Sequence, residues 1–146
     1  MSRVDFYILP DNSSTDRFAC TIAAKAWSTG NRVHIHTQSD EMANVIDDLL
    51  WIYRDISFIP HEIFNGSTSD ETPVTIGSGS NHPEQAQVII NLDQDIPAFA
   101  SSFERIVEIV GGSETNKQLA RQRYRQYLEG DYDIHDHKIE TINENG

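Results

Sequence analysis

The sequence predicts a single α/β domain whose mostly parallel sheet is flanked by helices. Over the first 50 residues, short apolar runs suited to buried strands alternate with longer segments that carry apolar side chains at helical spacing. This alternation is typical of parallel sheets, in which a helix connects each strand to the next. The 146 residues fit one domain, and no internal repeat is visible. A chain of this length needs neither a metal nor a disulfide to fold.

The first half of the chain gives the clearest elements. Residues 4–9 form an apolar run that ends at Pro10, and residues 32–37 form a second predicted strand. Between them, the polar segment 13–16 supplies helix-capping side chains, apolar residues follow at helical spacing through Trp27, and Gly30 marks the end of the helix. Residues 39–50 repeat the helical pattern.

The second half is more broken. The expected elements, in chain order, are an extended piece at 57–60, a loop at 65–72, a strand at 74–76, a loop at 77–83, a strand at 87–92, a helical turn at 97–102, an extended segment at 103–110 and a helix at 114–129. From residue 131 onward the chain is polar and acidic, with little apolar material for a core. We therefore predict a folded domain over 1–130 and a flexible acidic tail over 131–146.

Composition argues against several classes of protein. The net charge of −12 repels a phosphate backbone, so generic nucleic-acid binding is not expected. The one cysteine, Cys20, cannot form an internal disulfide and is expected to be a packed side chain of the first helix. The N-terminus lacks a signal-peptide pattern, and no apolar stretch approaches the roughly 18 residues that span a membrane. We expect a cytoplasmic protein.

The sequence offers no catalytic constellation. Residues 10–14, after the first strand, lack the glycine fingerprint of a dinucleotide site, and Gly77-Ser78-Gly79 lacks the lysine of a P-loop. The pairs His34 with His36 and His135 with His137 would each leave a zinc site two ligands short. We predict no catalytic residue, no metal and no cofactor.

The last predicted helix carries the strongest functional signal. Residues 105–125 hold five basic residues and two acids, so this window carries +3 while the rest of the chain carries −15. At about 100° per residue, one continuous stripe of the helix contains Lys117, Arg121, Tyr124, Arg125 and Leu128. A stripe of cations around a ring suits an acidic peptide that ends in an apolar side chain. The alternative is a solvated helix face.

The order and spacing of several segments resemble the chi subunit family of bacterial DNA polymerase III. The segments that carry the resemblance, over residues 4–128, are Asp5-Phe6-Tyr7, residues 22–27 with 30–33, Leu50-Trp51, residues 57–61 and residues 117–124. Membership implies a fold related to nucleotide-binding folds without that activity. It also implies a non-catalytic adaptor in DNA replication that meets DNA only indirectly.

The resemblance implies two protein partners. The acidic C-terminal tail of single-stranded-DNA-binding protein would bind at Lys117, Arg121, Tyr124 and Arg125, with Val110 lining the pocket. The psi subunit would bind at Trp51 and Phe58, where a helicase-like repair protein is a further partner. Without the resemblance, Trp51 and Phe58 would both be assigned to the core. Two other functions stay open, a direct single-stranded-DNA binder and a nucleotide-binding α/β enzyme.

The sequence departs from the family pattern near the proposed pocket. Gly111-Gly112 replaces a bulkier stretch, and the segment from Asp131 onward has no counterpart. We hypothesise that acidic residues within 126–146 compete with a ligand for the basic stripe, so that truncation after residue 129 tightens tail binding.

Overall fold

The computed structural model describes residues 2–11, 13–52, 59–64, 72–80 and 82–140. In these residues the chain forms seven strands, three α-helices and one 3₁₀ turn. Their bounds are β1 (Arg3–Ile8), α1 (Thr15–Ser28), β2 (Val33–Thr37), α2 (Asp40–Ile52), β3 (His61–Ile63), β4 (Val74–Ser78), β5 (Val88–Asn91), η1 (Ala100–Ser102), β6 (Arg105–Val110), α3 (Glu114–Glu129) and β7 (Asp133–Lys138). The predicted fold class is confirmed.

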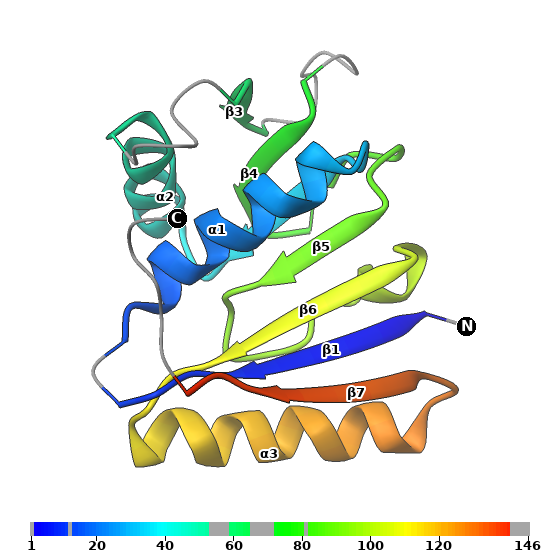
Figure 1. Ribbon diagram of the computed structural model, residues 1–146. Coiled ribbons are helices and arrows are strands. Elements are labelled where there is room, and N and C mark those ends of the chain that lie inside the picture. The colour runs from blue at the N-terminus through cyan, green and yellow to red at the C-terminus, as the bar shows by residue number, and fades with distance from the viewer. Residues whose placement is uncertain (1, 12, 53–58, 65–71, 81, 141–146) are drawn as a thin grey trace.

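All seven strands join one parallel sheet (Figure 1). The spatial order is β3-β4-β2-β5-β6-β1-β7, and every pair is parallel. β1 therefore lies between β6 and β7, although it is the first element of the chain. Strands covered on both faces are rich in apolar residues, as residues 4–9 and 87–92 are, although the buried Asp5 and Asn91 interrupt these two runs.

Two apolar layers cover the two faces of the sheet. On one face, α1 and α2 pack against β2, β4 and β5 through residues such as Ile22, Ile46 and Ile35. On the other, α3 and the segment around η1 pack against β1 and β6 through residues such as Phe103 and Tyr127. Among the described residues, no helix is both long and apolar enough to cross a bilayer.

Local sequence sets the ends of α1 as predicted, and a serine also caps α3. The side chain of Ser14 accepts a hydrogen bond from the backbone N–H of Arg17 at the start of α1, and Ser113 accepts one from Asn116 at the start of α3. Gly30, just after α1, has a φ of 89°, a conformation that favours glycine. These residues fix where α1 begins and ends and where α3 begins.

The expectation of a flexible tail beyond residue 130 is wrong for residues 133–138. These residues form β7, which pairs with β1 along its whole length, from Arg3 opposite Asp133 to Ile8 opposite Lys138. The segment looks polar because β7 is an edge strand, and an edge strand needs little core material. A truncation after residue 129 would thus remove a strand of the sheet and could not test competition by a tail.

Candidate functional site

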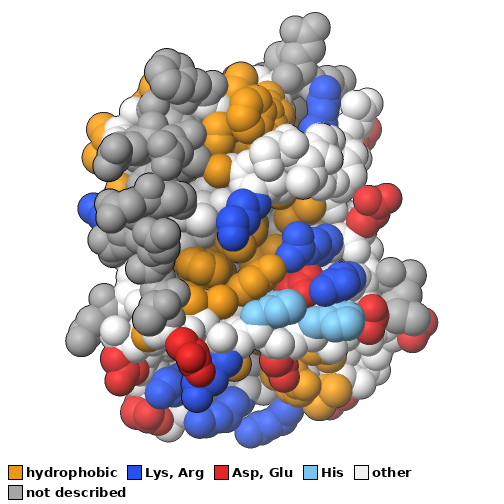
Figure 2. Space-filling view, in the orientation of Figure 1, with side chains coloured by type: hydrophobic (Ala, Val, Ile, Leu, Met, Phe, Trp, Pro, Cys, Tyr) orange, Lys and Arg blue, Asp and Glu red, His pale blue; other side chains and the backbone are white. Residues whose placement is uncertain are grey.

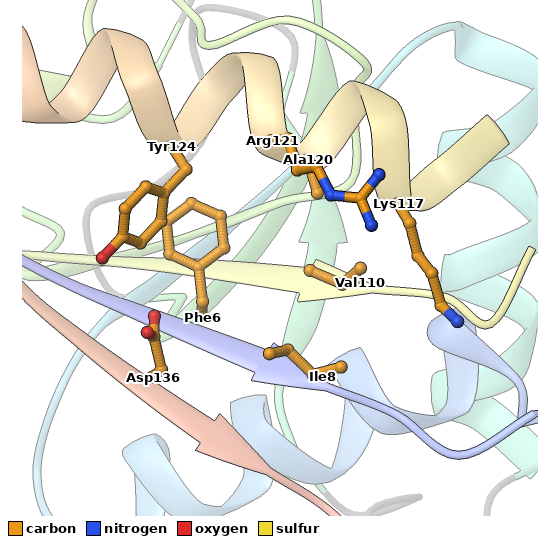
Figure 3. A pocket seen from close by; sticks show the side chains of 8 residues that line it. All are labelled: Phe6, Ile8, Val110, Lys117, Ala120, Arg121, Tyr124 and Asp136. Atoms are coloured by element: carbon orange, nitrogen blue, oxygen red, sulfur yellow. The ribbon is translucent and has the colours of Figure 1, made fainter. Parts of the chain in front are cut away.

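A pocket opens between α3 and the neighbouring strands (Figure 3). Its volume is about 240 Å³. The sheet supplies its apolar floor and α3 supplies one wall. The lining side chains are Phe6, Ile8 and Val110 from β1 and β6, Lys117, Ala120, Arg121 and Tyr124 from α3, and Asp136 from β7.

A buried polar network sets the rotation of α3 above this floor. The Nε of Arg123 donates to Oε1 of Glu108 at 2.9 Å, and the hydroxyl of Tyr127 donates to Oε2 at 2.7 Å. Asn91 donates to the same Oε2 at 2.9 Å. Because Arg123 and Tyr127 both face the sheet, the side chains on the adjoining face of α3 must turn toward the pocket and solvent.

Glu108 is fully buried, and its ionisation depends on this network. Burial raises the pKa of Glu108 above its ordinary value, while the charge of Arg123 and the hydrogen bonds from Asn91 and Tyr127 oppose that rise. Burial, with the nearby Glu108 carboxylate, also raises the pKa of Tyr127, which keeps its hydroxyl a donor. The network therefore holds α3 by hydrogen bonds that need both Arg123 and Tyr127 in place.

The pocket joins apolar contact area to positive charge. The ring of Tyr124 is half-buried, with its centroid 5.3 Å from that of Phe6, so the two rings form one wall. Lys117 lies 3.8 Å from Glu114, which is a loose and exposed pair. Within the described part of the chain, the exposed Arg121 makes no ion pair or hydrogen bond. Its guanidinium is free to bind a carboxylate from solution.

The structure gathers four of the five residues predicted for tail binding. Lys117, Arg121, Tyr124 and Val110 line one pocket, whereas Arg125 is exposed on α3 and is not part of the lining. In the space-filling view, Lys and Arg side chains gather along the edge of the molecule that α3 forms (Figure 2). Whether these residues bind a tail remains a prediction.

Half of the lining was not predicted from the sequence, namely Phe6, Ile8, Ala120 and Asp136. Phe6 and Ile8 are two residues apart on β1, so they share the face that α3 covers. Asp5 lies on the other face of β1, and this alternation of polar and apolar residues is the local signal that could have found them. Asp136 was missed because its segment was assigned to a tail.

The basic window over residues 105–125 proves less uniform than its composition suggests. Arg123 is buried against Glu108, and Arg105 donates to Asp5 at 2.7 Å on the opposite face of the sheet. Both charges are paired within the protein, although the side chain of Arg105 is 33% exposed. The cations left for a ligand at α3 are Lys117, Arg121 and Arg125.

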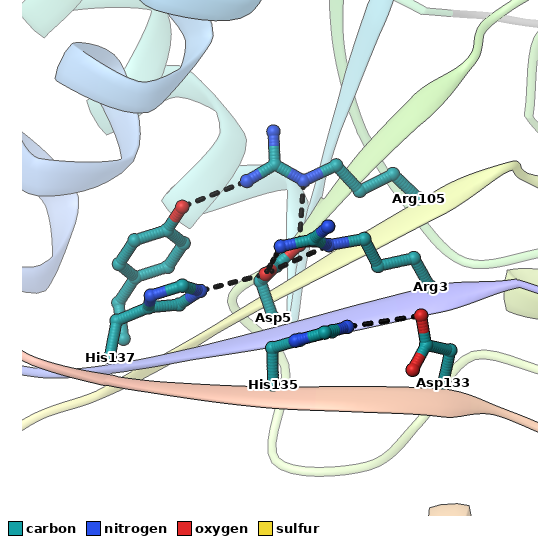
Figure 4. Close-up of polar contacts among 7 residues, drawn as sticks. Arg3, Asp5, Arg105, Asp133, His135 and His137 are labelled. Atoms are coloured by element: carbon teal, nitrogen blue, oxygen red, sulfur yellow. Dashed lines mark hydrogen bonds and ion pairs between the residues drawn. The ribbon is translucent and has the colours of Figure 1, made fainter.

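Asp5 anchors β7 to the sheet from the face away from the pocket (Figure 4). Its buried carboxylate accepts hydrogen bonds from Arg3, Arg105 and His137. Burial alone would raise the pKa of Asp5, but these hydrogen bonds lower it to about 2. His137 also stacks on the ring of Tyr7, with centroids 4.7 Å apart. The network holds β7, and with it Asp136, against β1.

The residues predicted for the psi subunit lie at the end of α2. Trp51 is 60% exposed, with its ring centroid 4.6 Å from that of His61, and the neighbouring Ile52 is 75% exposed. The assignment of Trp51 to the core is therefore wrong. Phe58 lies outside the described residues. Two large apolar side chains exposed next to each other are typical of a protein-binding surface.

The other candidates from the sequence occupy structural positions. Burial, aided by the charge of Asp16, raises the pKa of the Cys20 thiol to about 12. His34 is buried and bonded to Thr75, and burial together with His36 and His82 lowers its pKa to about 3. Among the described residues, no group of three His, Cys, Asp or Glu side chains is arranged to hold a metal ion.

Comparison with known proteins adds a family and a fold. Residues 1–135 match a family model described as DNA polymerase III chi subunit, HolC. The DNA polymerase III subunit chi of Pseudomonas aeruginosa is 35% identical over 144 residues, covering 97% of this chain and 100% of that protein. The subunit chi of Haemophilus influenzae is 36% identical over 124 residues, covering 83% and 86%.

Among solved structures, the chain resembles a Saccharomyces cerevisiae Dbp5 variant bound to a Gle1 variant and IP6. The TM-score is 0.60 at 9% identity, over 91% of this chain and 42% of that one. At such low identity the likeness shows the fold alone. The parallel sheet flanked by helices is thus an arrangement that distant proteins share.

Proposed function

The chain belongs to the DNA polymerase III chi subunit family, and from this premise we propose that it is a non-catalytic adaptor in bacterial DNA replication. One surface, the pocket beside α3, would bind the acidic C-terminal tail of single-stranded-DNA-binding protein. The other, the exposed end of α2, would bind the psi subunit and so join the polymerase complex. The adaptor would act in the cytoplasm and would meet DNA only through its partners.

The observation that carries the proposal is the chemistry of the α3 pocket. A chain end with an apolar last residue needs a hollow for one side chain and a cation for its carboxylate. The floor of Ile8 and Val110 offers the hollow, and Lys117 and Arg121 stand at its rim. Arg binds carboxylates through two parallel donors, and the aliphatic stem of Lys adds apolar cover.

Net charge supports a protein ligand over bare DNA. The whole chain carries −12, and two of the arginines between residues 105 and 125 are already paired with Asp5 and Glu108. A few local cations suffice for one short acidic segment, whereas a DNA strand would also meet the negative remainder of the surface. A weak contact to many identical tails gains occupancy from their high local concentration.

The surface at the end of α2 supports the second partnership. Trp51 and Ile52 expose apolar area next to each other, and Trp is among the residues that dominate binding energy at interfaces. Phe58 follows closely in the sequence but lies outside the described residues, so its part in this surface stays a prediction. A helicase-like repair protein that uses this surface would compete with psi.

Calorimetry with an acidic peptide that ends in Asp-Ile-Pro-Phe tests the tail site. We expect weak binding that weakens further with salt, and loss of binding when the final Phe is removed. Arg121→Glu should lower the affinity by about tenfold or more, because it turns an attraction into a repulsion at the rim. The matched control is Lys25→Glu, which makes the same charge change at an exposed position on α1.

Two results would overturn the tail site. One is equal loss of affinity in the Arg121 and Lys25 variants, which would mean that net charge alone drives binding. The other is preference of the wild-type protein for a bare single-stranded oligonucleotide over the peptide. Circular dichroism of each variant checks that the fold survives.

A further inference from the structure

We propose that Asp136 makes the α3 pocket directional: it repels acidic ligand groups from the β7 side, so that an acidic chain whose end is held in the pocket leaves across α3. This inference rests on the proposed function, because it concerns how the same pocket holds its ligand. Asp136 thereby becomes a specificity-determining residue of the site.

The pocket carries opposite charges on opposite sides. Lys117 and Arg121 extend from α3 at one end, beside Val110 and Ile8, while Asp136 rises from β7 at the other end, near Phe6 and Tyr124 (Figure 3). The register explains its position, since Asp136 is directly opposite Phe6 and shares its face of the sheet.

The two charged sides do not neutralise each other. In the part of the chain that the structure describes, Asp136 makes no hydrogen bond or ion pair, and neither does Arg121. The rings of Phe6 and Tyr124, 5.3 Å apart, form an apolar wall in this pocket. The field across the pocket is therefore that of a dipole, with its positive end on α3 and its negative end on β7.

A ligand must match this dipole to bind. Its carboxylates gain by lying against Lys117 and Arg121 and lose by approaching Asp136. At the β7 side the favoured groups are N–H donors, such as the ligand backbone, or cationic side chains. An acidic chain whose end is held in the pocket should therefore leave across α3, toward Arg125, and not across β7.

This path gives Arg125 a role although it does not line the pocket. It is exposed and four residues beyond Arg121, one helical turn along α3. Acidic residues upstream of the bound chain end would reach it after leaving the pocket. Asp136 blocks the other route, so the two residues act in the same direction.

Anchoring makes the carboxylate on β7 a fixed feature of the site. β7 pairs with β1 along six residues, and His137 donates to the buried Asp5 at 2.8 Å on the opposite face. Because Asp136 is on a paired strand, its backbone is held in place beside the pocket as that of a loop would not be.

The test compares Asp136→Asn with Asp133→Asn in peptide calorimetry. Both substitutions remove one negative charge from β7, but Asp133 is opposite Arg3 and so lies on the face away from the pocket. We expect Asp136→Asn to raise affinity for the acidic peptide by about threefold to tenfold at low salt, and the gain to shrink as salt increases. Asp133→Asn should change affinity by less than about twofold.

A second arm tests direction. Each acid of the peptide is replaced in turn by its amide, and by lysine. Lysine at the position nearest β7 should bind wild type better than Asp136→Asn. Arg125→Gln should weaken only peptides that keep their upstream acids.

The outcomes distinguish a failure of the directional role of Asp136 from a failure of the proposed tail binding. If the wild-type protein binds no acidic peptide, the proposed function fails and the inference fails with it. If wild type binds but Asp136→Asn and Asp133→Asn have equal effects, the tail site stands and the directional role of Asp136 is wrong. Asp136→Ser repeats the test with a smaller side chain, and circular dichroism confirms the fold of each variant.

Discussion

Replacing Arg123 by Met should destabilise the protein more than most single substitutions. Met keeps much of the aliphatic volume but removes the charge that faces Glu108. The Glu108 carboxylate is fully buried and would retain only the neutral donors Asn91 and Tyr127. Removing one partner of a buried ion pair typically costs about 3–5 kcal/mol, because the other charge stays desolvated.

That cost is large against the free energy of unfolding of an ordinary domain, about 5–15 kcal/mol. The assay is urea unfolding at pH 7, followed by circular dichroism. Arg125→Met is the matched control, since Arg125 is exposed on the same helix and its loss should cost less than about 0.5 kcal/mol.

The double variant Glu108→Gln with Arg123→Met tests whether the unpaired charge of Glu108 causes the loss of stability. Without Arg123, burial raises the pKa of Glu108 even further, so folding favours the protonated acid. The loss in Arg123→Met should then shrink as the pH falls, because the unfolded chain also becomes protonated. It should also shrink when Gln replaces Glu108. A loss under about 1 kcal/mol, or a double variant no more stable than Arg123→Met, would refute the argument.

Three further predictions concern other sites. Trp51→Ala should change the free energy of unfolding by less than about 1 kcal/mol, since the side chain is 60% exposed, yet abolish capture of psi in a pull-down; a large loss of stability with capture intact would contradict it. The pKa of His34 is lowered from 6.5 to about 3, so on acidification the unfolded chain takes up a proton that the folded chain resists. The free energy of unfolding should therefore decrease by about 2 kcal/mol as the pH is lowered from 7 to 5. Urea unfolding at several pH values should show a weaker pH dependence of the free energy of unfolding for His34→Gln than for wild type, and equal pH dependence would dismiss the idea. Gly112→Ala should cost about 1–3 kcal/mol, because the new Cβ would lie 2.9 Å from the backbone Cα of Asp11, and an unchanged melting temperature would disprove that close approach.

Local patterns predicted the elements that local physics governs. The helix cap at Ser14 and the glycine after α1 are where the sequence indicates them, because each depends on neighbours a few residues away. The strand runs were equally visible, since strands covered on both faces are mostly apolar even where a buried polar residue such as Asp5 interrupts them. The stripe of Lys117, Arg121 and Tyr124 followed from helical geometry alone.

Features that depend on distant partners were not predictable. Nothing local distinguishes the buried Arg123 from the exposed Arg125, because the difference is made by Glu108 on β6. β7 contains too few apolar residues to signal a strand, since its pairing with β1 replaces a core contribution. Asp136 was missed for that reason, because it joins the sheet side of the pocket only through the pairing of β7 with β1.

The position of β1 has a consequence for how the protein is made. Arg3 is opposite Arg105 on one side and Asp133 on the other, so β1 precedes both of its partner strands by most of the domain. Until β6 and β7 have been synthesised, β1 keeps two unsatisfied edges that could recruit the wrong strand. Correct assembly of this sheet therefore depends on its last two strands, and a chain that stops before β7 would leave one edge of β1 open to aggregation.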